Sequence, residues 1–474
     1  MILEKEQINR YLRHILIPEI SGSGQKKLLD LSVFICGESV NDIASAIYYL
    51  AAAGVGHIRY LLADYSGSDE LAANIHDLNQ DVTLGAADNS NADLRIFLGR
   101  PEFIIKKQGL LTVDFVPSVI VLYNGWQGGL QISKDSDCLQ HFLAQLAEVP
   151  EIAGSQEQDN TGEVFANCVC GALCVVEVIK LALEIGGATD GFLAFDLLAM
   201  EFSKVANAEI ENALHQLGAQ KLPTCQATGL GSKKVLIVGT GGLGSPAAYA
   251  LALAGVGTIG LVDYDTVEIS NLNRQILHAV SRLGMPKVES AAIFLKNVKP
   301  SLTINRYNTS LSKENVAEII AGYDIVIDAV DNFPTRFLLN DACYFSNKPM
   351  IDAGVIRFDG TARTILPQEG PCYRCTLPAI PAPGSVPSCF ETGVLGPVPG
   401  IMGFIQAAEA VKYVLDQGRL LTDRMLYFDG LFADFINIKL RKNGECPLCG
   451  ANPTIRKLKE YEFRCMDEAI DENK

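Results

Sequence analysis

The sequence predicts an α/β protein whose two doubly wound units arose by internal duplication and pack as a pseudo-dimer within one chain. One observation is a match between VFICGESVNDIASAIYYLAAAGVGHIRYLL, which begins at Val33, and VLIVGTGGLGSPAAYALALAGVGTIGLVD, which begins at Val235. The two segments align with a single-residue gap. Each has the pattern of an apolar strand, a turn, a helix of small residues, an A-G-V-G corner and a second apolar strand.

A second match follows in the same order along the chain. GALCVVEVIKLALE from Gly171 resembles GFIQAAEAVKYVLD from Gly403, and both have the apolar spacing of a helix. Two ordered matches indicate a duplication, although any two strand–helix–strand units share some likeness. Residues 217–232 have the Gly, Pro, Thr and Ser content of a linker. We therefore expect two domains, at residues 1–220 and 228–474.

Charge and cysteine content narrow the class of protein. The formal charge of -16 argues against nucleic acid as the main partner, because no basic surplus exists to displace counterions. An acidic surface suits a basic protein partner or serves only solubility. The first residues lack a signal-type apolar core, and the uncharged stretch 235–262 is broken by glycines. We expect a cytoplasmic protein without a membrane span, in which clustered cysteines serve metal binding or catalysis.

The two units differ at the turn after their first strand. The second unit has a glycine-rich turn there, whereas the first has Glu38 and Asp42, whose carboxylates would repel a phosphate. Where the second unit has Asp263, the alignment places Leu62 in the first. We therefore predict that the first unit keeps the fold but has lost the chemistry of nucleotide binding, as a pseudo-enzyme does.

The glycine-rich turn VLIVGTGGLG has G-x-G-x-x-G spacing between a predicted strand and a predicted helix. Such glycines let backbone N–H groups approach a phosphate that the helix dipole favours. Asp263 ends the next strand, a position suited to hydrogen-bonding ribose hydroxyls. NAD-dependent dehydrogenases share both features, so these features predict a Rossmann-like nucleotide site without naming the nucleotide. The glycines predicted to bind it are Gly239, Gly241, Gly242 and Gly244.

The residues that follow favour ATP over NAD. A triphosphate bears about four negative charges, so its site needs cations and usually a Mg²⁺ held by a carboxylate. Arg274 and Lys287 can supply the cations, and Asp331 can hold the metal at the carboxyl end of its strand. Each residue alone is compatible with an ordinary surface position, but together in this order they predict a nucleotide site. The polar residues expected to accompany them are Asp265, Ser270, Asn271, Gln275 and Asn332.

Two C-x₂-C pairs, about seventy residues apart, predict a zinc site in the second unit. The pairs are CYRC, at Cys372 and Cys375, and CPLC, at Cys446 and Cys449. Four thiolates close a tetrahedral shell and leave no position for water, so the metal is expected to be structural. Two redox-active dithiols are the alternative. Ordinary core positions are expected for the cysteines in apolar runs, namely Cys36, Cys138, Cys174 and Cys343.

At this point the second unit resembles the ThiF/MoeB/HesA family over residues 228–450. GTGGLG, DYDTVEISNLNRQ, GMPK, AVDN, PCYRC, SCFETGVLGPVPG and ECPLCG occur in the family's order. The resemblance implies ATP-dependent adenylation of the C-terminal carboxylate of a small ubiquitin-like or sulfur-carrier protein, with release of pyrophosphate. It also implies that Gly241 cradles phosphates, Asp263 holds the ribose, Ser270, Asn271, Arg274 and Lys287 contact nucleotide or phosphates, Asp331 binds Mg²⁺ and the four cysteines bind Zn²⁺.

The N-terminal segment RYLRHI, residues 10–15, is similar to the family's R-Y-x-R-Q-I helix. In homodimeric members the arginine of that helix reaches the partner subunit's ATP site. Residues 217–232 contain no Arg, so the second unit lacks such a segment. We therefore predict that Arg13, with Arg10 as the second choice, is an arginine finger supplied by the first unit. An ordinary charged amphipathic helix is the alternative.

A thiol suited to a second step is Cys389, in the Pro- and Gly-rich segment IPAPGSVPSCFETGVLG. Some relatives use a cysteine here to form a thioester or acyl-disulfide, whereas others keep it without needing it. The setting makes the thiol accessible, but no basic neighbour in sequence lowers its pKa. Cys225 and Cys465 are weaker candidates.

Three other functions stay open at this level. The enzyme could adenylate a ribosomally made precursor peptide in natural-product biosynthesis. A non-catalytic scaffold suits the first unit better than the second. An NAD oxidoreductase fits least well, because the cations and the carboxylate after the glycine turn have no role in one. Since the duplication already supplies a partner surface, a monomer is expected.

Overall fold

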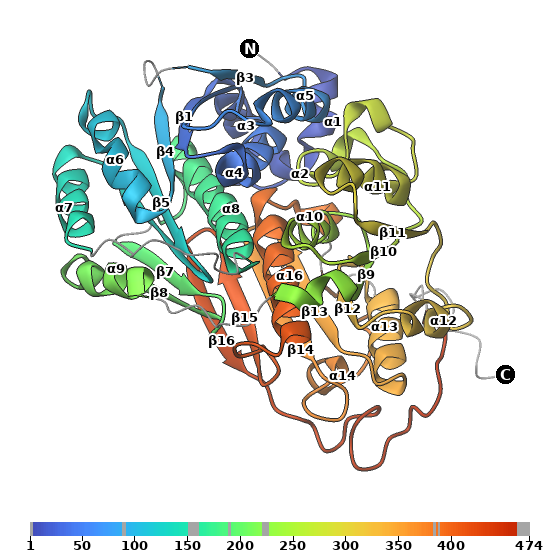
Figure 1. Cartoon of the computed structure of the whole chain (residues 1–474). Coiled ribbons are helices and arrows are strands. Elements are labelled where there is room, and N and C mark those ends of the chain that lie inside the picture. The colour runs from blue at the N-terminus through green and yellow to red at the C-terminus, as the bar shows by residue number, and fades with distance from the viewer. Residues whose placement is uncertain are drawn as a thin grey trace.

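The computed structural model describes residues 3–87, 92–149, 161–187, 191–219, 227–382, 385–386 and 389–461. Within these residues the strands form two eight-stranded sheets (Figure 1). Their strand orders are β3-β2-β1-β4-β5-β6-β7-β8 and β11-β10-β9-β12-β13-β14-β15-β16, which are the same order in two parts of the chain. The prediction of two duplicated α/β units is therefore confirmed.

In the first half, the strands from β1 to β5 pair in parallel and the last three pair antiparallel. The strands are β1 (Ser32–Gly37), β2 (His57–Leu62), β3 (Thr83–Ala86), β4 (Leu94–Gly99), β5 (Ser118–Asn124), β6 (Gln127–Ser133), β7 (Phe192–Asp196) and β8 (Glu201–Val205). The helices are α1 (Lys5–Arg10), α2 (Leu12–Ile15), α3 (Ser21–Asp30), α4 (Val40–Ala53), α5 (Ser68–Leu78), α6 (Pro101–Thr112), α7 (Ser136–Ala147), α8 (Thr161–Leu183) and α9 (Ile210–Ala219), with a 3₁₀ turn at Asn207–Glu209.

The second half repeats this pairing pattern after a 3₁₀ turn at Ala227–Ser232. Its strands are β9 (Lys234–Val238), β10 (Thr258–Val262), β11 (Thr303–Tyr307), β12 (Ile325–Asp328), β13 (Met350–Ile356), β14 (Asp359–Ile365), β15 (Arg424–Asp429) and β16 (Asp434–Lys439). Its helices are α10 (Gly244–Ala254), α11 (Lys287–Val298), α12 (Val316–Ala321), α13 (Phe333–Phe345), α14 (Tyr373–Thr376), α15 (Cys389–Thr392) and α16 (Pro397–Leu415), with 3₁₀ turns at Ile269–Asn271 (η3) and Val280–Arg282 (η4).

The A-G-V-G corner has the same geometry in both halves. Gly54 and Gly255 end their helices with φ of 83° and 87°, a left-handed conformation that favours glycine. Two residues on, a Cβ at Gly56 or at Gly257 would lie 1.8 Å from a backbone oxygen of the segment before the sheet. The corner is therefore set by the same steric constraint in each unit, which explains why its sequence is repeated.

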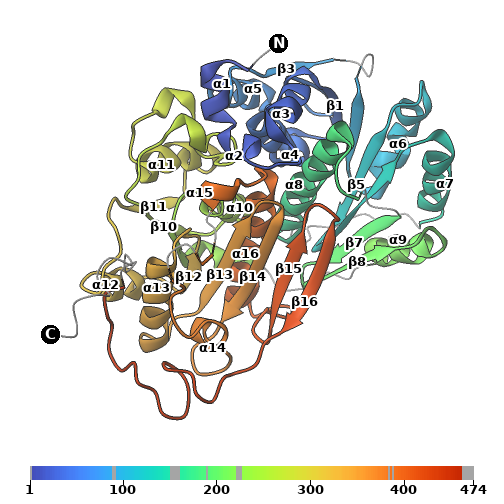
Figure 2. The ribbon, with the colours of Figure 1, turned by 180° about the vertical axis from the view of Figure 1, so that it is seen from behind.

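The two halves pack through their matching long helices, α8 and α16, which lie side by side in Figures 1 and 2. Reciprocal backbone hydrogen bonds flank them: Gly187 N–H donates to Leu431 O (3.0 Å), and Arg419 N–H donates to Leu198 O (2.6 Å). Reciprocity of this kind is the mark of an isologous two-fold interface. The predicted intramolecular pseudo-dimer is therefore confirmed, and a monomeric state in solution stays a prediction.

Each of these helices buries a Glu–Lys ion pair one turn apart. The Nζ–Oε1 distance is 2.8 Å for Lys180–Glu177 and 2.6 Å for Lys412–Glu409. Lys412 also donates to Leu197 O of the first half (2.7 Å), so a buried cation joins the two units. Among the described helices, α8 has the length and composition of a membrane span, but 89% of its apolar window is buried inside the protein.

Candidate functional site

A cavity of about 540 Å³ opens at the carboxyl edge of the second sheet, where the strand order reverses beside β9. Ligands of open α/β sheets bind at such a switch point because neighbouring loops diverge there. The cavity brings together residues that lie nearly a hundred positions apart in the sequence. The predicted site residues that line it are Gly239, Gly241, Gly242, Asp263, Asp265, Arg274, Gln275, Lys287, Asp331 and Asn332.

The glycine turn follows β9 and contributes backbone to the cavity wall. Gly239 has φ of 94°, and a Cβ there would lie 2.6 Å from Ala329 O, so a side chain is excluded. Gly244 is not among the lining residues. A Cβ at Gly244 would lie 1.9 Å from Gly239 O, which shows that this glycine serves the close approach of α10 to β9.

Asp263 follows β10, and its carboxylate is held by the glycine turn. Its Oδ2 accepts hydrogen bonds from Thr240 N (2.7 Å) and Thr240 Oγ1 (2.9 Å). Its Oδ1 accepts from Asp265 N at 3.0 Å. These contacts fix a carboxylate at the cavity edge, one strand away from the turn that would hold phosphates.

Two cations line the same cavity. Lys287 is 6% exposed, and its Nζ lies 2.8 Å from Asp265 Oδ2. Arg274 Nη1 donates to Ser270 O and to Asn273 Oδ1, both at 2.8 Å. Burying a charge is costly unless it is paired, and Asp265 provides that partner for Lys287 in the cavity wall. The arrangement provides positive charge in the same cavity as the glycine turn, with Arg274 Cδ 3.6 Å from the position of a Cβ at Gly242.

Two predicted nucleotide ligands, Ser270 and Asn271, lie outside the lining of the cavity. Asn271 Oδ1 accepts from Glu268 N at 3.0 Å, which caps the short helix η3. Ser270 contributes its carbonyl to Arg274. In this structure both residues shape the segment that carries Arg274, and direct contact with a nucleotide stays a prediction for them.

Asp331 and Asn332 follow β12, across the switch point from Asp263. Asp331 is an exposed carboxylate in the cavity lining. Asn332 caps α13, with its Oδ1 accepting from Thr335 N at 3.0 Å. An accessible carboxylate beside a turn that would hold phosphates is a suitable donor for Mg²⁺, so the residues present fit that ion.

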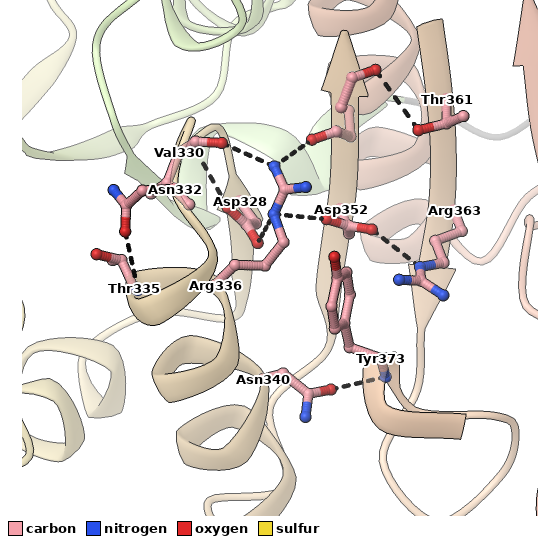
Figure 3. A network of polar contacts seen from close by, with 12 residues as sticks. Asp328, Val330, Asn332, Thr335, Arg336, Asn340, Asp352, Thr361, Arg363 and Tyr373 are labelled. Atoms are coloured by element: carbon pink, nitrogen blue, oxygen red, sulfur yellow. Dashed lines mark hydrogen bonds and ion pairs between the residues drawn. The ribbon is translucent and has the colours of Figure 1, made fainter. Parts of the chain in front are cut away.

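A buried charge network behind Asp331 was missed by sequence reasoning (Figure 3). Arg336 Nε lies 3.4 Å from Asp328 Oδ2 and 3.3 Å from Asp352 Oδ1, and Arg363 Nε donates to Asp352 Oδ2 at 2.9 Å. Burial raises the pKa of Asp328 to about 7. Charged residues inside the apolar strands around Asp328 and Asp352 are the signal that could have revealed it, since such groups need partners.

The same arginine holds the backbone of the loop that carries Asp331. Arg336 Nη2 donates to Val330 O and to Ala353 O, both at 2.7 Å (Figure 3). Val330 N–H in turn donates to Asp328 Oδ1 at 3.1 Å. The residue before Asp331 is thus bonded on both its N–H and its carbonyl, which restricts where the Asp331 carboxylate can lie.

The N-terminal helices of the first half reach the edge of this cavity. Arg13 O accepts from the N–H of Val394, a lining residue, at 3.1 Å. His14 Nε2 accepts from Gly396 N at 2.9 Å. Burial lowers the pKa of His14 to about 4, which keeps it the neutral acceptor that this bond requires. The first half therefore contacts the segment that carries the lining residue Val394, and Figure 2 shows α15 beside α2.

The side chains of the two candidate arginine fingers differ in setting. Arg10 Nη1 donates to Leu78 O at 2.8 Å, within the first half. Arg13 is buried one turn later, on the helix that touches Val394. Arg10 thus supports its own unit, and the finger role of Arg13 stays a prediction.

At the corresponding edge of the first sheet, polar side chains of the first half pair with one another. Arg100 forms a bidentate pair with Glu163, with Nε–Oε1 of 3.0 Å and Nη2–Oε2 of 2.8 Å. Tyr123 donates to Asp42 Oδ1, and Asp42 Oδ2 accepts from Ser39 N at 2.6 Å. The Asp42 carboxylate thus bonds the turn of the first half at the place where the second half has glycines. These contacts favour the predicted loss of nucleotide binding by the first half.

The four cysteines of the two C-x₂-C pairs meet at the end of the second half. All four Sγ atoms lie within 4.8 Å of one another, with Cys372–Cys446 at 3.6 Å and Cys375–Cys449 at 3.3 Å. Four thiolates at this spacing fit a closed tetrahedral Zn²⁺ shell.

The remaining described cysteines differ in burial. Cys36, Cys174 and Cys343 are buried as expected, while Cys138 is partly exposed. Cys389 is the first residue of α15, but its side chain is not among those described. Cys225 and Cys465 lie outside the described residues.

Comparison with known proteins agrees with this geometry. The ThiF family matches residues 214–448. A "SAMP-activating enzyme E1" of Haloferax volcanii is 48% identical over 219 residues, which cover 46% of this chain and 81% of that protein. This chain belongs to the ThiF family. An "adenylyltransferase and sulfurtransferase MOCS3" of Drosophila sechellia is 44% identical over 57% of this chain, and one of Danio rerio is 42% identical over 56%. The chain spans 60% and 58% of these two ThiF relatives.

Proposed function

We propose that this protein uses ATP to adenylate the C-terminal carboxylate of a small ubiquitin-like or sulfur-carrier protein. The observation that carries the proposal is the cavity at the switch point of the second sheet, which gathers a glycine turn, two cations and an accessible carboxylate. The relatives, named as a SAMP-activating enzyme and as adenylyltransferases, support the same activity.

The chemistry matches what these groups can do. An oxygen of the acceptor's carboxylate forms a bond to the α-phosphorus of ATP, and the bond from that phosphorus to the bridging oxygen breaks. Pyrophosphate leaves with the electron pair, and an acyl-adenylate remains. No proton needs to move, so charge neutralisation and alignment make up the catalysis. Arg274 and Lys287 would neutralise the phosphates, and Asp263 would hold the ribose.

Asp331 would hold Mg²⁺, whose charge would stabilise the leaving pyrophosphate. Gly239, Gly241 and Gly242 would supply the backbone around the phosphates, together with Gln275 and Asn332. The first half, residues 1–220, would act as a non-catalytic partner and contribute Arg13 to the site in residues 228–474. Its contacts with Val394 and Gly396, at the cavity edge, support that division of labour.

A second step would transfer the activated acyl group to Cys389, with displacement of AMP by the thiolate. Cys389 precedes the segment 393–396 that the first half holds against the cavity. A Cys389→Ser variant would keep pyrophosphate exchange and lose any adduct that dithiothreitol cleaves. A wild-type enzyme that forms no such adduct while making acyl-AMP would exclude this step.

The first step is tested by exchange of labelled pyrophosphate into ATP with candidate acceptors. Exchange that requires a ubiquitin-like protein ending in Gly-Gly is expected, and exchange that requires only a precursor peptide would assign the natural-product role instead. Asp331→Asn and Arg274→Ala should each reduce exchange by about 10²-fold or more. Arg306→Ala is the matched control, because that arginine pairs with Glu289 on the surface. Unchanged exchange in the Asp331 or Arg274 variant would refute the proposed site.

A further inference from the structure

The C-terminal segment of the described chain supplies an aromatic wall to the cavity. Tyr461 lies about 200 residues from the glycine turn in sequence, yet it lines the same cavity. Figure 1 shows the segment after β16 passing α14 and returning to α12. Other residues that line the cavity are Leu311, from the loop after β11, and Pro334 and Thr335, from the first turn of α13.

The ring of Tyr461 is held in place by a buried ion pair. Its hydroxyl donates to Asp341 Oδ2 at 2.5 Å. Asp341 is fully buried and makes a bidentate pair with Arg374, with Nε–Oδ1 of 2.7 Å and Nη2–Oδ2 of 2.9 Å. The Arg374 guanidinium lies 5.0 Å from the centroid of the Tyr461 ring and 4.5 Å from that of Phe337. The hydroxyl and one side of the ring are therefore fixed before any ligand binds.

The neighbouring residue anchors the segment at a second point. Glu460 Oε2 accepts from Lys313 N at 3.2 Å, just after the loop of Thr309, Ser310 and Leu311 that also lines the cavity. The segment thus runs between the loop after β11 and the helix α13. An ordered span of this kind loses little entropy when a ligand packs on it.

The order of the strands indicates which part of a nucleotide would meet Tyr461. The glycine turn follows β9, Asp263 follows the neighbouring strand β10, and the loop of Leu311 follows β11, the next strand outward. A nucleotide with its phosphates on the glycine turn and its ribose at Asp263 places its base toward the loop after β11. Leu311, Pro334 and Tyr461 provide apolar and aromatic surface there, which suits the flat faces of a purine.

We infer that Tyr461 binds the adenine base of ATP by packing its ring on the base, and that Asp341 and Arg374 position that ring. This inference rests on the proposed function, since it requires ATP in the cavity. Arg374 lies between Cys372 and Cys375, so the short helix α14 that carries the first cysteine pair also carries the arginine that supports the Tyr461 ring. The cysteine cluster is thereby connected to nucleotide affinity through one ion pair.

The test compares a ligand that has a base with one that has none. Isothermal titration would measure the Kd of MgATP and of magnesium tripolyphosphate for wild type, Tyr461→Ala and Tyr461→Phe. Tyr461→Ala should weaken MgATP by about tenfold or more and leave tripolyphosphate unchanged, because stacking involves only the base. Tyr461→Phe keeps the ring and loses the bond to Asp341, so a smaller loss for MgATP alone is expected.

The matched control is Tyr413→Ala, a partly buried tyrosine on α16 that is not among the residues lining the cavity. Its MgATP affinity should equal that of wild type. Equal MgATP affinity in Tyr461→Ala and wild type would overturn the inference, and so would an equal loss for MgATP and tripolyphosphate. If wild type binds neither ligand, the proposed function itself fails, so the two failures are distinguishable.

Discussion

Replacing Arg336 with Met tests whether the buried network behind Asp331 sustains both the fold and the site. Arg336 is the cation between Asp328, which is 0% exposed, and Asp352, which is 5% exposed, and it donates to two backbone carbonyls. Met fills a similar volume but removes the charge and the donors. The variant therefore leaves buried acceptors without partners.

The expected cost follows from what remains after the change. Removing one partner of a buried ion pair costs about 3–5 kcal/mol. Asp352 keeps Arg363 at 2.9 Å, and burial already raises the pKa of Asp328 to about 7, so that carboxyl can take up a proton. We therefore expect the low end of the range, a loss of about 3 kcal/mol in the free energy of unfolding.

Urea unfolding followed by two signals measures this cost. Trp126, the single tryptophan, reports on the first half by fluorescence, while far-UV circular dichroism reports on both halves. The circular dichroism transition should move to lower urea. Arg306→Met, which removes an exposed pair with Glu289, should change the free energy by no more than about 1 kcal/mol.

The catalytic consequence has its own readout. Because Arg336 holds Val330 O, its loss frees the loop that carries Asp331, and misplacement of a catalytic group by about 1 Å costs about 10²-fold in rate. The kcat/KM for pyrophosphate exchange should fall to that extent at a urea concentration of zero. A variant that keeps wild-type stability within 1 kcal/mol and wild-type exchange would refute the reasoning.

Three further predictions concern other parts of the molecule. Arg13→Ala should lower pyrophosphate exchange by about 10²-fold or more with little change in the urea midpoint. Arg10→Ala should chiefly lower stability, because Arg10 donates a hydrogen bond to Leu78 O. Unchanged exchange in the Arg13 variant would exclude the arginine finger. Cys446→Ser should remove bound zinc, measured by atomic absorption, and lower the thermal midpoint as chelation does; a variant that retains zinc would contradict the cluster. Asp328→Asn tests the raised pKa of Asp328, which is about 7 in the folded protein against an ordinary value of 3.8. Between these two pH values the carboxyl is protonated in the folded protein and ionised in the unfolded one. The stability of wild type should therefore fall relative to that of the variant as pH rises from about 4 to about 7. A constant difference over this pH range would show that Asp328 ionises normally.

The duplication and the glycine turn could be predicted because they depend on local patterns. The same order of strand, turn and helix patterns occurs in both units. The A-G-V-G corner has the same sequence in both because a side chain at its second glycine would clash with the backbone. The two cysteine pairs were equally predictable, since ligand spacing within each pair is a local property. Most residues proposed to bind ATP also line one cavity, because the carboxyl ends of neighbouring strands meet at one edge.

What the sequence missed depends on contacts between distant segments. The side chain of Asn271 caps η3, a contact that sequence spacing does not specify, while its contact with the nucleotide stays a prediction. The partners of Asp328 and Asp352 come from a helix and a neighbouring strand, and His14 bonds a residue 382 positions away. Such pairings are set by how layers stack rather than by local pattern.

By itself, the sequence determined the fold class, the presence of two related units and the residue types at the edge of the second sheet. Only the tertiary structure decided that Tyr461 lines that same edge and that its hydroxyl is held by the buried pair of Asp341 and Arg374. The physical reason is that periodicity and turn chemistry act over a few residues, whereas the segment of Tyr461 is held at the cavity by contacts with Asp341 and Lys313, which lie 120 and 147 positions from their partners.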